Sequence, residues 1–255
     1  MASFKGLLIL AFFLISPLCF ALNSSAQELV TNGDFEAGGL AGWTTAANEP
    51  DGSGCGFFRY SGTQSFNGNS IQAPPEGSHA VSSDSLDPPC SSVIYQEITV
   101  PSGEEVSCFL IYYYENFADE FILGPGLNSS DVGTANQQAR IDIMTENAGN
   151  FNTGSGVLEN LVQTEPGDPN TLDYTTLVFD LTDYAGSTVK LRAAQASNRG
   201  VLLFAIDSVS CTVEDLIGDD EISTVPTLSG WGMIAMAGVL GLVGFMVIRR
   251  RKATA

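Results

Sequence analysis

Hydrophobic and polar residues alternate along the middle of the chain, and this period of two predicts β-strands. In one such segment Ala139, Ile141 and Ile143 fall on one face of the predicted strand, and polar Arg140 and Asp142 fall on the other. Alternation, or a dense run of aliphatic and aromatic residues, predicts strands at 93–100, 106–114, 139–145, 175–181, 188–194 and 202–209. Regularly spaced strands with one polar face indicate an all-β fold of two packed antiparallel sheets.

Stretches rich in glycine, asparagine, proline and serine separate these segments. The longest are 48–75, 124–138 and 147–173, and we expect them to form connecting loops. The middle of the chain shows no convincing helical period and no internal repeat. It therefore reads as one β-sandwich body.

The first 26 residues have the order of a secretory signal peptide. Lys5 provides a positive start, residues 6–22 are apolar, and small residues precede a cleavage site after Ala26. A signal peptide is removed from the mature protein and is not part of the fold. This segment predicts export through the secretion machinery and cleavage by signal peptidase.

The chain ends on a second apolar run, the 18 residues from Trp231 to Ile248. As a helix this run would be about 27 Å long, close to the roughly 30 Å of a bilayer core. A basic stop follows it, made of Arg249, Arg250, Arg251 and Lys252. Cations hold such an end in the cytoplasm, and Trp231 suits the opposite interface. One transmembrane helix over 231–248 is predicted, and a plain membrane anchor is one interpretation.

A short motif immediately before this helix favours a second interpretation. The segment 225–232 reads Val-Pro-Thr-Leu-Ser-Gly-Trp-Gly. The order of motif, helix and basic stop resembles the IPTL-CTERM tail of bacterial surface proteins, with Val225 in place of the usual isoleucine. The residues that carry the motif are Val225, Pro226, Thr227, Leu228, Trp231 and Gly232. The resemblance implies a sorting signal over 225–255 that an exosortase-type membrane protease recognises and cuts.

Between the two ends lies an exported body, predicted at 27–211, followed by an acidic linker at 212–224. All 29 acidic residues of the chain fall between the signal peptide and the sorting motif, against five cations, so this part has a formal net charge of −24. Such a charge repels nucleic acid and an anionic membrane surface. We therefore expect no nucleic-acid partner.

Several short motifs of the body resemble carbohydrate-binding jelly rolls and their galactose-binding-like relatives. They occur in the expected order over nearly the whole body, and they lie at 29–36, 42–43, 75–80, 96–103, 179–186, 189–192 and 204–210. The resemblance implies a two-sheet antiparallel jelly-roll sandwich. It says little about the ligand.

Four cysteines remain after signal removal: Cys55, Cys90, Cys108 and Cys211. An even number in an oxidising compartment predicts two disulfides, and four cysteines allow three pairings. We predict Cys55–Cys90 and Cys108–Cys211. The second pair requires the strand at 106–114 to lie antiparallel beside the last strand, and the jelly-roll resemblance supports that arrangement.

The resemblance also implies a structural calcium ion that ties the first strand to the last. Its oxygen ligands would come from Glu36, which matches a family glutamate, Asp207, which matches a family aspartate, and Asp34. The alternative is that Asp34 and Glu36 belong to a turn and Asp207 is a hydrogen-bonded carboxylate at the edge of the core.

A concave sheet of this fold can bind glycans through aromatic and polar side chains. The predicted set is Tyr112, Tyr113, Tyr114, Arg140 and Asp142, with Lys190 and Arg192 on outward faces nearby and Phe58 and Tyr60 at a rim. Because side chains alternate along a strand, at least one of the three consecutive tyrosines must be in the core. The alternative is that these aromatics pack and these charges are merely solvated.

Catalytic motifs are not evident in the sequence. His79 is the single histidine, and the chain contains neither a Gly-x-Ser-x-Gly elbow nor a phosphate-binding loop. We therefore predict a non-catalytic surface protein with a structural or adhesive role in the envelope or extracellular matrix. A carbohydrate-binding module for surface polysaccharide is the alternative, and a glycoside hydrolase is a third and weaker one.

Overall fold

A computed structural model of the chain describes residues 26–48, 54–86, 88–127 and 133–214. The chain divides into two units, Met1–Asp215 and Leu216–Ala255, and the described residues all belong to the first. Apart from one short 3-10 helix, η1 (Thr182–Tyr184), the regular elements of the described part are strands. They are β1 (Gln27–Glu28), β2 (Thr44–Asn48), β3 (Gly56–Tyr60), β4 (Ala80–Asp84), β5 (Cys90–Thr99), β6 (Glu105–Asn116), β7 (Gln137–Thr145), β8 (Val157–Gln163), β9 (Thr171–Asp180), β10 (Thr188–Ser197) and β11 (Leu202–Glu214).

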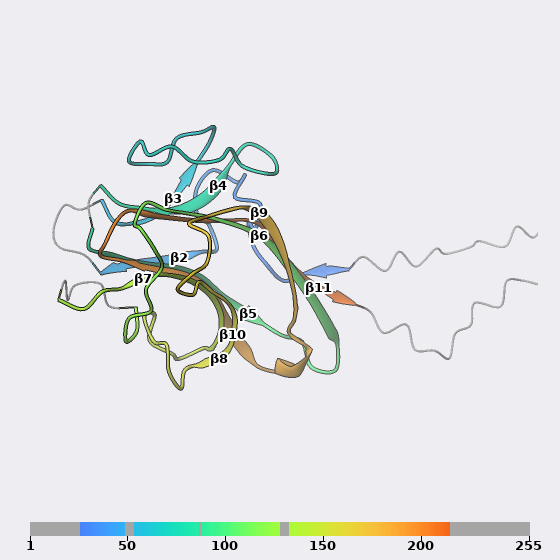
Figure 1. The fold of residues 1–255 in the computed structure, drawn as a ribbon. Coiled ribbons are helices and arrows are strands. Elements are labelled where there is room, and N and C mark those ends of the chain that lie inside the picture. The colour runs from blue at the N-terminus through green and yellow to red at the C-terminus, as the bar shows by residue number, and fades with distance from the viewer. Residues whose placement is uncertain (1–25, 49–53, 87, 128–132, 215–255) are drawn as a thin grey trace, which may run out of the picture. The chain divides into compact units, whose positions relative to one another are not determined.

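The strands form two antiparallel sheets that face one another (Figure 1). The first sheet has the order β3-β4-β11-β6-β9, with β1 also paired to β11, and the second has the order β2-β5-β10-β7-β8. The eight strands from β4 to β11 give the orders β4-β11-β6-β9 and β5-β10-β7-β8, which is the strand order of a jelly roll. The predicted all-β jelly-roll sandwich is confirmed.

The core lies between the two sheets and is filled by alternate residues of each strand. Ala139, Ile141 and Ile143 enter it from β7 of the second sheet, as their alternation predicts, and Leu110 and Phe204 enter it from the first. These side chains are at most 1% exposed. Burial of their apolar surface is the main force that holds the sheets together.

Both predicted disulfides are present. Cys55 precedes β3 and Cys90 opens β5, so this bond connects the two sheets, with the Cα atoms 5.5 Å apart. Cys108 and Cys211 lie directly opposite one another on β6 and β11 within the first sheet, with the Cα atoms 4.1 Å apart. The required antiparallel pairing of the last strand with the strand at 106–114 is therefore confirmed.

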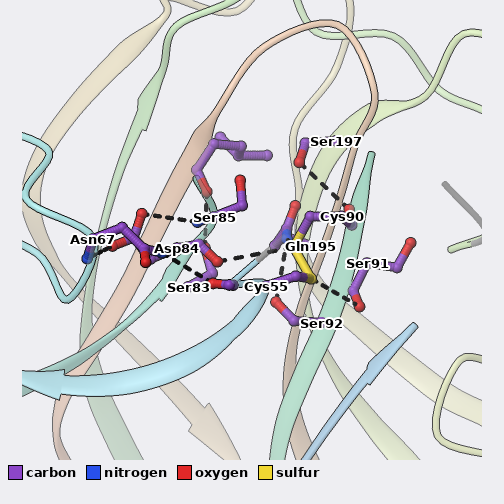
Figure 2. Close-up of a disulfide and its surroundings, with 12 residues drawn as sticks. Cys55, Asn67, Ser83, Asp84, Ser85, Cys90, Ser91, Ser92, Gln195 and Ser197 are labelled. Atoms are coloured by element: carbon purple, nitrogen blue, oxygen red, sulfur yellow. Dashed lines mark hydrogen bonds between the residues drawn. A yellow bond between two sulfur atoms is a disulfide. The ribbon is translucent and has the colours of Figure 1, made fainter. Parts of the chain in front are cut away.

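Figure 2 shows the polar surroundings of the Cys55–Cys90 bond. The side-chain amide of Gln195 donates to the Cys90 sulfur at 2.9 Å and to the Ser92 hydroxyl at 3.1 Å. Nearby, the buried carboxylate of Asp84 accepts hydrogen bonds from the backbone of Asn67 and Ser85 and from the side chain of Asn69. Most buried polar groups here are held by hydrogen bonds, which removes most of their desolvation cost, but the Oε1 of Gln195 has no partner among the described residues.

The sequence pattern missed five short strands, β1, β2, β3, β4 and β8. β1, β2 and β4 were not predicted, and β3 and β8 lie in stretches expected to be loops. β8 reads Val-Leu-Glu-Asn-Leu-Val-Gln, has no fully buried residue and stands at the edge of its sheet, so little alternation marks it. β11 also continues to Glu214, three residues beyond the predicted end of the body, because Thr212 and Val213 still pair with β6 and β1.

The predicted signal peptide and sorting tail lie almost wholly outside the described residues, as does the transmembrane helix expected at 231–248. Within the part of the chain that the structure describes, no helix is long and apolar enough to cross a membrane.

Candidate functional site

The outer face of the second sheet is not the open polar surface that the sequence pattern indicates. Arg140, Asp142, Lys190 and Arg192 point to this face, as predicted, but they are only 5%, 0%, 7% and 1% exposed. The expectation that they are solvated is wrong. They form a buried ionic cluster that the chain itself covers.

Asp142 is the centre of this cluster. Its carboxylate accepts hydrogen bonds from Arg140 at 2.6 to 3.0 Å, from both Nε and Nη2 of Arg192, and from the Asn160 amide at 2.8 Å. Burial lowers the pKa of Arg192, and the attraction of Asp142 opposes that shift. One buried acid thus compensates two arginines, and the cluster depends on it.

The loop between β7 and β8 closes this face. Arg192 donates to the carbonyl oxygens of Asn150 and Asn152 at 2.7 and 2.8 Å, and Lys190 donates to that of Ala148 at 3.2 Å. An apolar cluster beside these bonds includes Leu127, Val93, Ala194 and Ala196, with Phe151 packed against it. Within the described part of the chain, the outward faces of β7 and β10 therefore offer no open platform for a glycan.

The three consecutive tyrosines lie on the first sheet, away from Arg140 and Asp142. Tyr114 enters the core, Tyr112 packs against the core half-buried, and Tyr113 points to the opposite face. Tyr113 is 1% exposed there, because Tyr60 and Tyr174 cover it and its hydroxyl donates to Glu115 at 2.6 Å. The predicted glycan set is thus split between two sheets and largely buried, and it does not form one site.

Tyr60, Tyr113 and Tyr174 form an outer cluster, and two of their hydroxyls are hydrogen-bonded to each other. The hydroxyls of Tyr60 and Tyr174 form a hydrogen bond, and the Tyr60 hydroxyl also donates to the carbonyl of Gln72 at 3.0 Å. Burial raises the pKa of Tyr60 to about 12. The side chains of Tyr60 and Tyr174 therefore cover this outer face of the first sheet as neutral packing groups.

The carboxylates predicted to bind calcium lie where the first loop meets β11. Glu36 is committed to the chain: Oε1 accepts the backbone amides of Ser78 and His79 at 2.6 and 2.7 Å, and Oε2 lies 2.9 Å from Nδ1 of His79. These hydrogen bonds, that of the His79 side chain above all, lower the pKa of Glu36 to about 2. Asp34, on the same loop, is exposed and accepts the backbone amide of Glu36 at 3.2 Å.

Asp207 has the opposite environment. It is fully buried, and among the described residues its Oδ2 has no hydrogen-bond partner, whereas Oδ1 accepts the amide of Ser208 at 2.7 Å. Burial raises the pKa of Asp207 to about 7, and the backbone amides of Ser208 and Glu76 act against that shift. An orphaned buried oxygen suits a cation, but within the described ranges no three histidine, cysteine, aspartate or glutamate residues form a group that could hold a metal. The corner therefore fits calcium only in part.

The backbone is strained at the same corner. Asn32, Phe35 and Ser208 adopt left-handed conformations with φ of 52°, 53° and 49°, which non-glycine residues rarely occupy. Gly33 lies so close to β11 that a Cβ on it would be 1.8 Å from the carbonyl oxygen of Val209. Residues held in such conformations cluster at functional sites.

An open groove of about 360 Å³ lies beside this strained corner. Phe109 projects into it from β6 and is 42% exposed, and Val30 and Val209 add apolar surface. Its polar lining includes the exposed Asp34 carboxylate and Ser208. The remaining lining residues are Glu28, Asn32, Gly33 and Ser210. This groove was not among the sites predicted from the sequence, although the alternation of buried Cys108 and Leu110 places Phe109 on the outward face.

A second groove, of about 390 Å³, lies between β8 and β9 at the open edge of the sandwich. Its floor includes Leu161 and Phe179, and its rim carries Glu159, Asp180 and Asp183. Asp180 is engaged by the backbone amide of Thr182 at 2.6 Å.

Comparison with solved structures finds weak likenesses. They include the carbohydrate-binding module TmCBM61 in complex with β-1,4-galactotriose, at 15% identity and a TM-score of 0.44 over 74% of this chain and 99% of that one. The K3 cleaved adhesin domain of Lys-gingipain from Porphyromonas gingivalis has 16% identity and a TM-score of 0.45 over 74% and 99%. The Stig cyclase Fisc from Fischerella sp. TAU has 16% identity and a TM-score of 0.42 over 74% and 98%.

These three proteins differ in activity, so the likeness assigns none to this chain. No curated protein matches it. The family model that does match covers the C-terminal region alone, and residues 225–252 of the chain carry an IPTL-CTERM motif.

Proposed function

We propose that the chain is an exported bacterial surface protein whose body acts without catalysis, as structural or adhesive material of the envelope or extracellular matrix. The observation that carries the proposal is the IPTL-CTERM motif at 225–252, joined to a body with two disulfides. Disulfides form in oxidising compartments outside the cytoplasm. A formal charge of −24 over the 198 residues between the signal peptide and the motif also keeps such bodies apart.

The precursor would meet three partners in turn: the secretion machinery, signal peptidase and an exosortase-type enzyme. In this proposal it crosses the inner membrane, is held by its tail as a single-pass precursor with the body outside, and reaches the surface or matrix after processing. The basic residues 249–252 would keep the tail end in the cytoplasm meanwhile.

Substitutions in the motif test this proposal. Pro226→Ala with Trp231→Ala should leave unprocessed chain in the membrane fraction and remove the body from the cell surface. Ser229→Ala is the matched control, because position 229 is a variable position of the motif resemblance. Equal surface labelling of all three proteins by an antibody against the body would overturn the sorting claim.

A second candidate function, glycan binding, is favoured by the groove beside Phe109. An exposed aromatic ring, an exposed carboxylate and hydroxyl groups are the side chains that bind a sugar by stacking and hydrogen bonding. None of the residues that line this groove is a lysine or arginine, whereas Glu28 and Asp34 are acidic. We therefore propose a neutral or amino-bearing sugar of a surface polysaccharide, and not a uronate.

A glycan array followed by calorimetry tests this candidate. Phe109→Ala and Asp34→Asn should weaken binding of the best glycan at least about tenfold, the loss of roughly 1.4 kcal/mol. Phe66→Ala is the control, because Phe66 is 64% exposed but stacks on Phe58, outside this groove. Binding that survives Phe109→Ala would remove the groove from the proposal, and turnover of the glycan would contradict a non-catalytic body.

We also propose a structural calcium ion with ligands from Asp34, Glu36 and Asp207. The orphaned Oδ2 of buried Asp207 supports it. A calcium ion would need six to eight oxygens, so Glu36 would have to leave part of its bonding with His79. Its role would be to hold the first loop on β11, with no chemistry of its own.

A further inference from the structure

The C-terminal end of the body is held in place differently from the N-terminal end. β11 runs to Glu214, and the chain continues from there into the sorting tail. Cys211 lies three residues before that end and is bonded to Cys108 on β6. Beyond the disulfide, β11 has three further partners on β6, the pairs of Thr212, Val213 and Glu214.

The N-terminal segment also contacts Cys211 and the residues that follow it. β1 pairs with β11 at Thr212 and Val213, and the two ends of the described body leave side by side (Figure 1). The amide of Leu29 donates to the carbonyl of Cys211 at 2.8 Å, and the amide of Cys211 donates to the Glu28 carboxylate at 2.9 Å. Cys211 is thus fixed by a covalent bond on one side and by two hydrogen bonds on the other.

Tension that arrives through the tail would act first on this end of β11. An antiparallel strand pulled away from its neighbour loses its backbone hydrogen bonds one after another, each contributing roughly 1 kcal/mol, so an unlocked strand peels at low force. Here peeling from the C-terminal side meets a covalent bond after Glu214, Val213 and Thr212. From there the load passes into β6, which is itself paired to both β11 and β9.

We propose that the body is a tension-bearing element, in which the Cys108–Cys211 disulfide locks the exit strand so that load from the tail enters two central strands together. The proposal rests on the proposed function, because a precursor held at its C-terminal tail, or a processed chain attached through a group added at its new C-terminus, is loaded from this side. Among the described residues the N-terminal end has no equivalent lock, because the first cysteine in that part of the chain is Cys55 and β1 contributes two residues.

Single-molecule force spectroscopy on the full chain tests this proposal. One handle is attached after Ala255 and the other to an azide-bearing residue in place of Glu165, in an exposed turn before β9. The force at which length is first released should fall at least about twofold in the Cys108→Ser/Cys211→Ser variant. Cys55→Ser/Cys90→Ser is the matched control, because that bond lies away from the exit and joins the two sheets (Figure 2), and it should keep the wild-type force. Equal forces for all three proteins would overturn the proposal.

A measurement without cysteine substitution covers the case in which a variant does not fold. In the disulfide-intact protein, the handle after Ala255 is replaced by one at Gln27, the first residue after the predicted signal peptide, and the force of first release is compared between the two pulling ends. The proposal requires a lower force from the N-terminal end, and equal forces would overturn it. Surface display of the motif variants is measured separately, so a failure of sorting and a failure of the lock give different results.

Discussion

Replacing Asp142 by alanine should destabilise the body more than almost any other single change of a charged residue. The carboxylate is fully buried and accepts hydrogen bonds from Arg140, Arg192 and Asn160. Its removal leaves two buried guanidinium groups without their acid, and breaking a buried pair in this way costs about 3–5 kcal/mol. We take about 4 kcal/mol, a large part of the roughly 5–15 kcal/mol by which such domains are stable.

Urea unfolding followed by tryptophan fluorescence measures this loss. With a slope of about 2.5 kcal/mol per molar urea, 4 kcal/mol moves the midpoint down by roughly 1.6 M. Asp183→Ala is the matched control, because Asp183 is exposed and such substitutions usually change stability by less than about 0.5 kcal/mol. If the two midpoints coincide, Asp142 is solvated in solution, and the closed outer face of the second sheet is wrong.

Three further predictions concern the first sheet and the corner beside it. Gly33→Ala should lower the free energy of unfolding by about 3 kcal/mol or more, because its Cβ would collide with the carbonyl of Val209; an unchanged urea midpoint would contradict that contact. The pKa of Tyr60 is about 12 in the folded protein and about 10 in the unfolded chain. The contribution of Tyr60 to the free energy of unfolding is therefore fully present below pH ~10, and up to about 2–3 kcal/mol is lost as the pH rises through ~12. Tyr60→Phe should reduce that loss in unfolding curves recorded at several alkaline pH values, and a loss of the same size in the variant would rule Tyr60 out as its source. Calcium should raise the melting temperature and a chelator should lower it, with no effect in Asp207→Asn; a melting temperature indifferent to calcium ends the calcium proposal.

Long strands with one apolar face in the core were predictable from the sequence, because packing in the core imposes the alternation that marks them. β7 and β10 are examples. The pairing of the last strand with the one at 106–114, which the predicted Cys108–Cys211 bond requires, was instead implied by the jelly-roll resemblance. β8 was not predictable, since an edge strand with an exposed face needs no such alternation. Its pairing with β7 depends on tertiary contacts, and the residues of β8 alone do not indicate that pairing.

The candidate sites were harder to predict, for a physical reason. Lys190 and Arg192 stand at outward positions of β10, and alternation alone cannot show that a loop folds back over them. The carbonyl groups of that loop accept hydrogen bonds from both cations, and these bonds offset the desolvation cost of burying them. Similarly, Phe109 lies in an apolar run, and its exposure depends on how the neighbouring strands and the first loop are arranged around it.

The most direct test of the central claim is the intact mass of the mature protein, isolated separately from the cell envelope and from the medium. We predict a chain that starts after the signal peptide and ends between Val225 and Gly232, alone or with an added group, because the IPTL-CTERM motif would then have been processed. A mass that runs through Ala255 would show a simple membrane anchor, and it would contradict sorting by the tail.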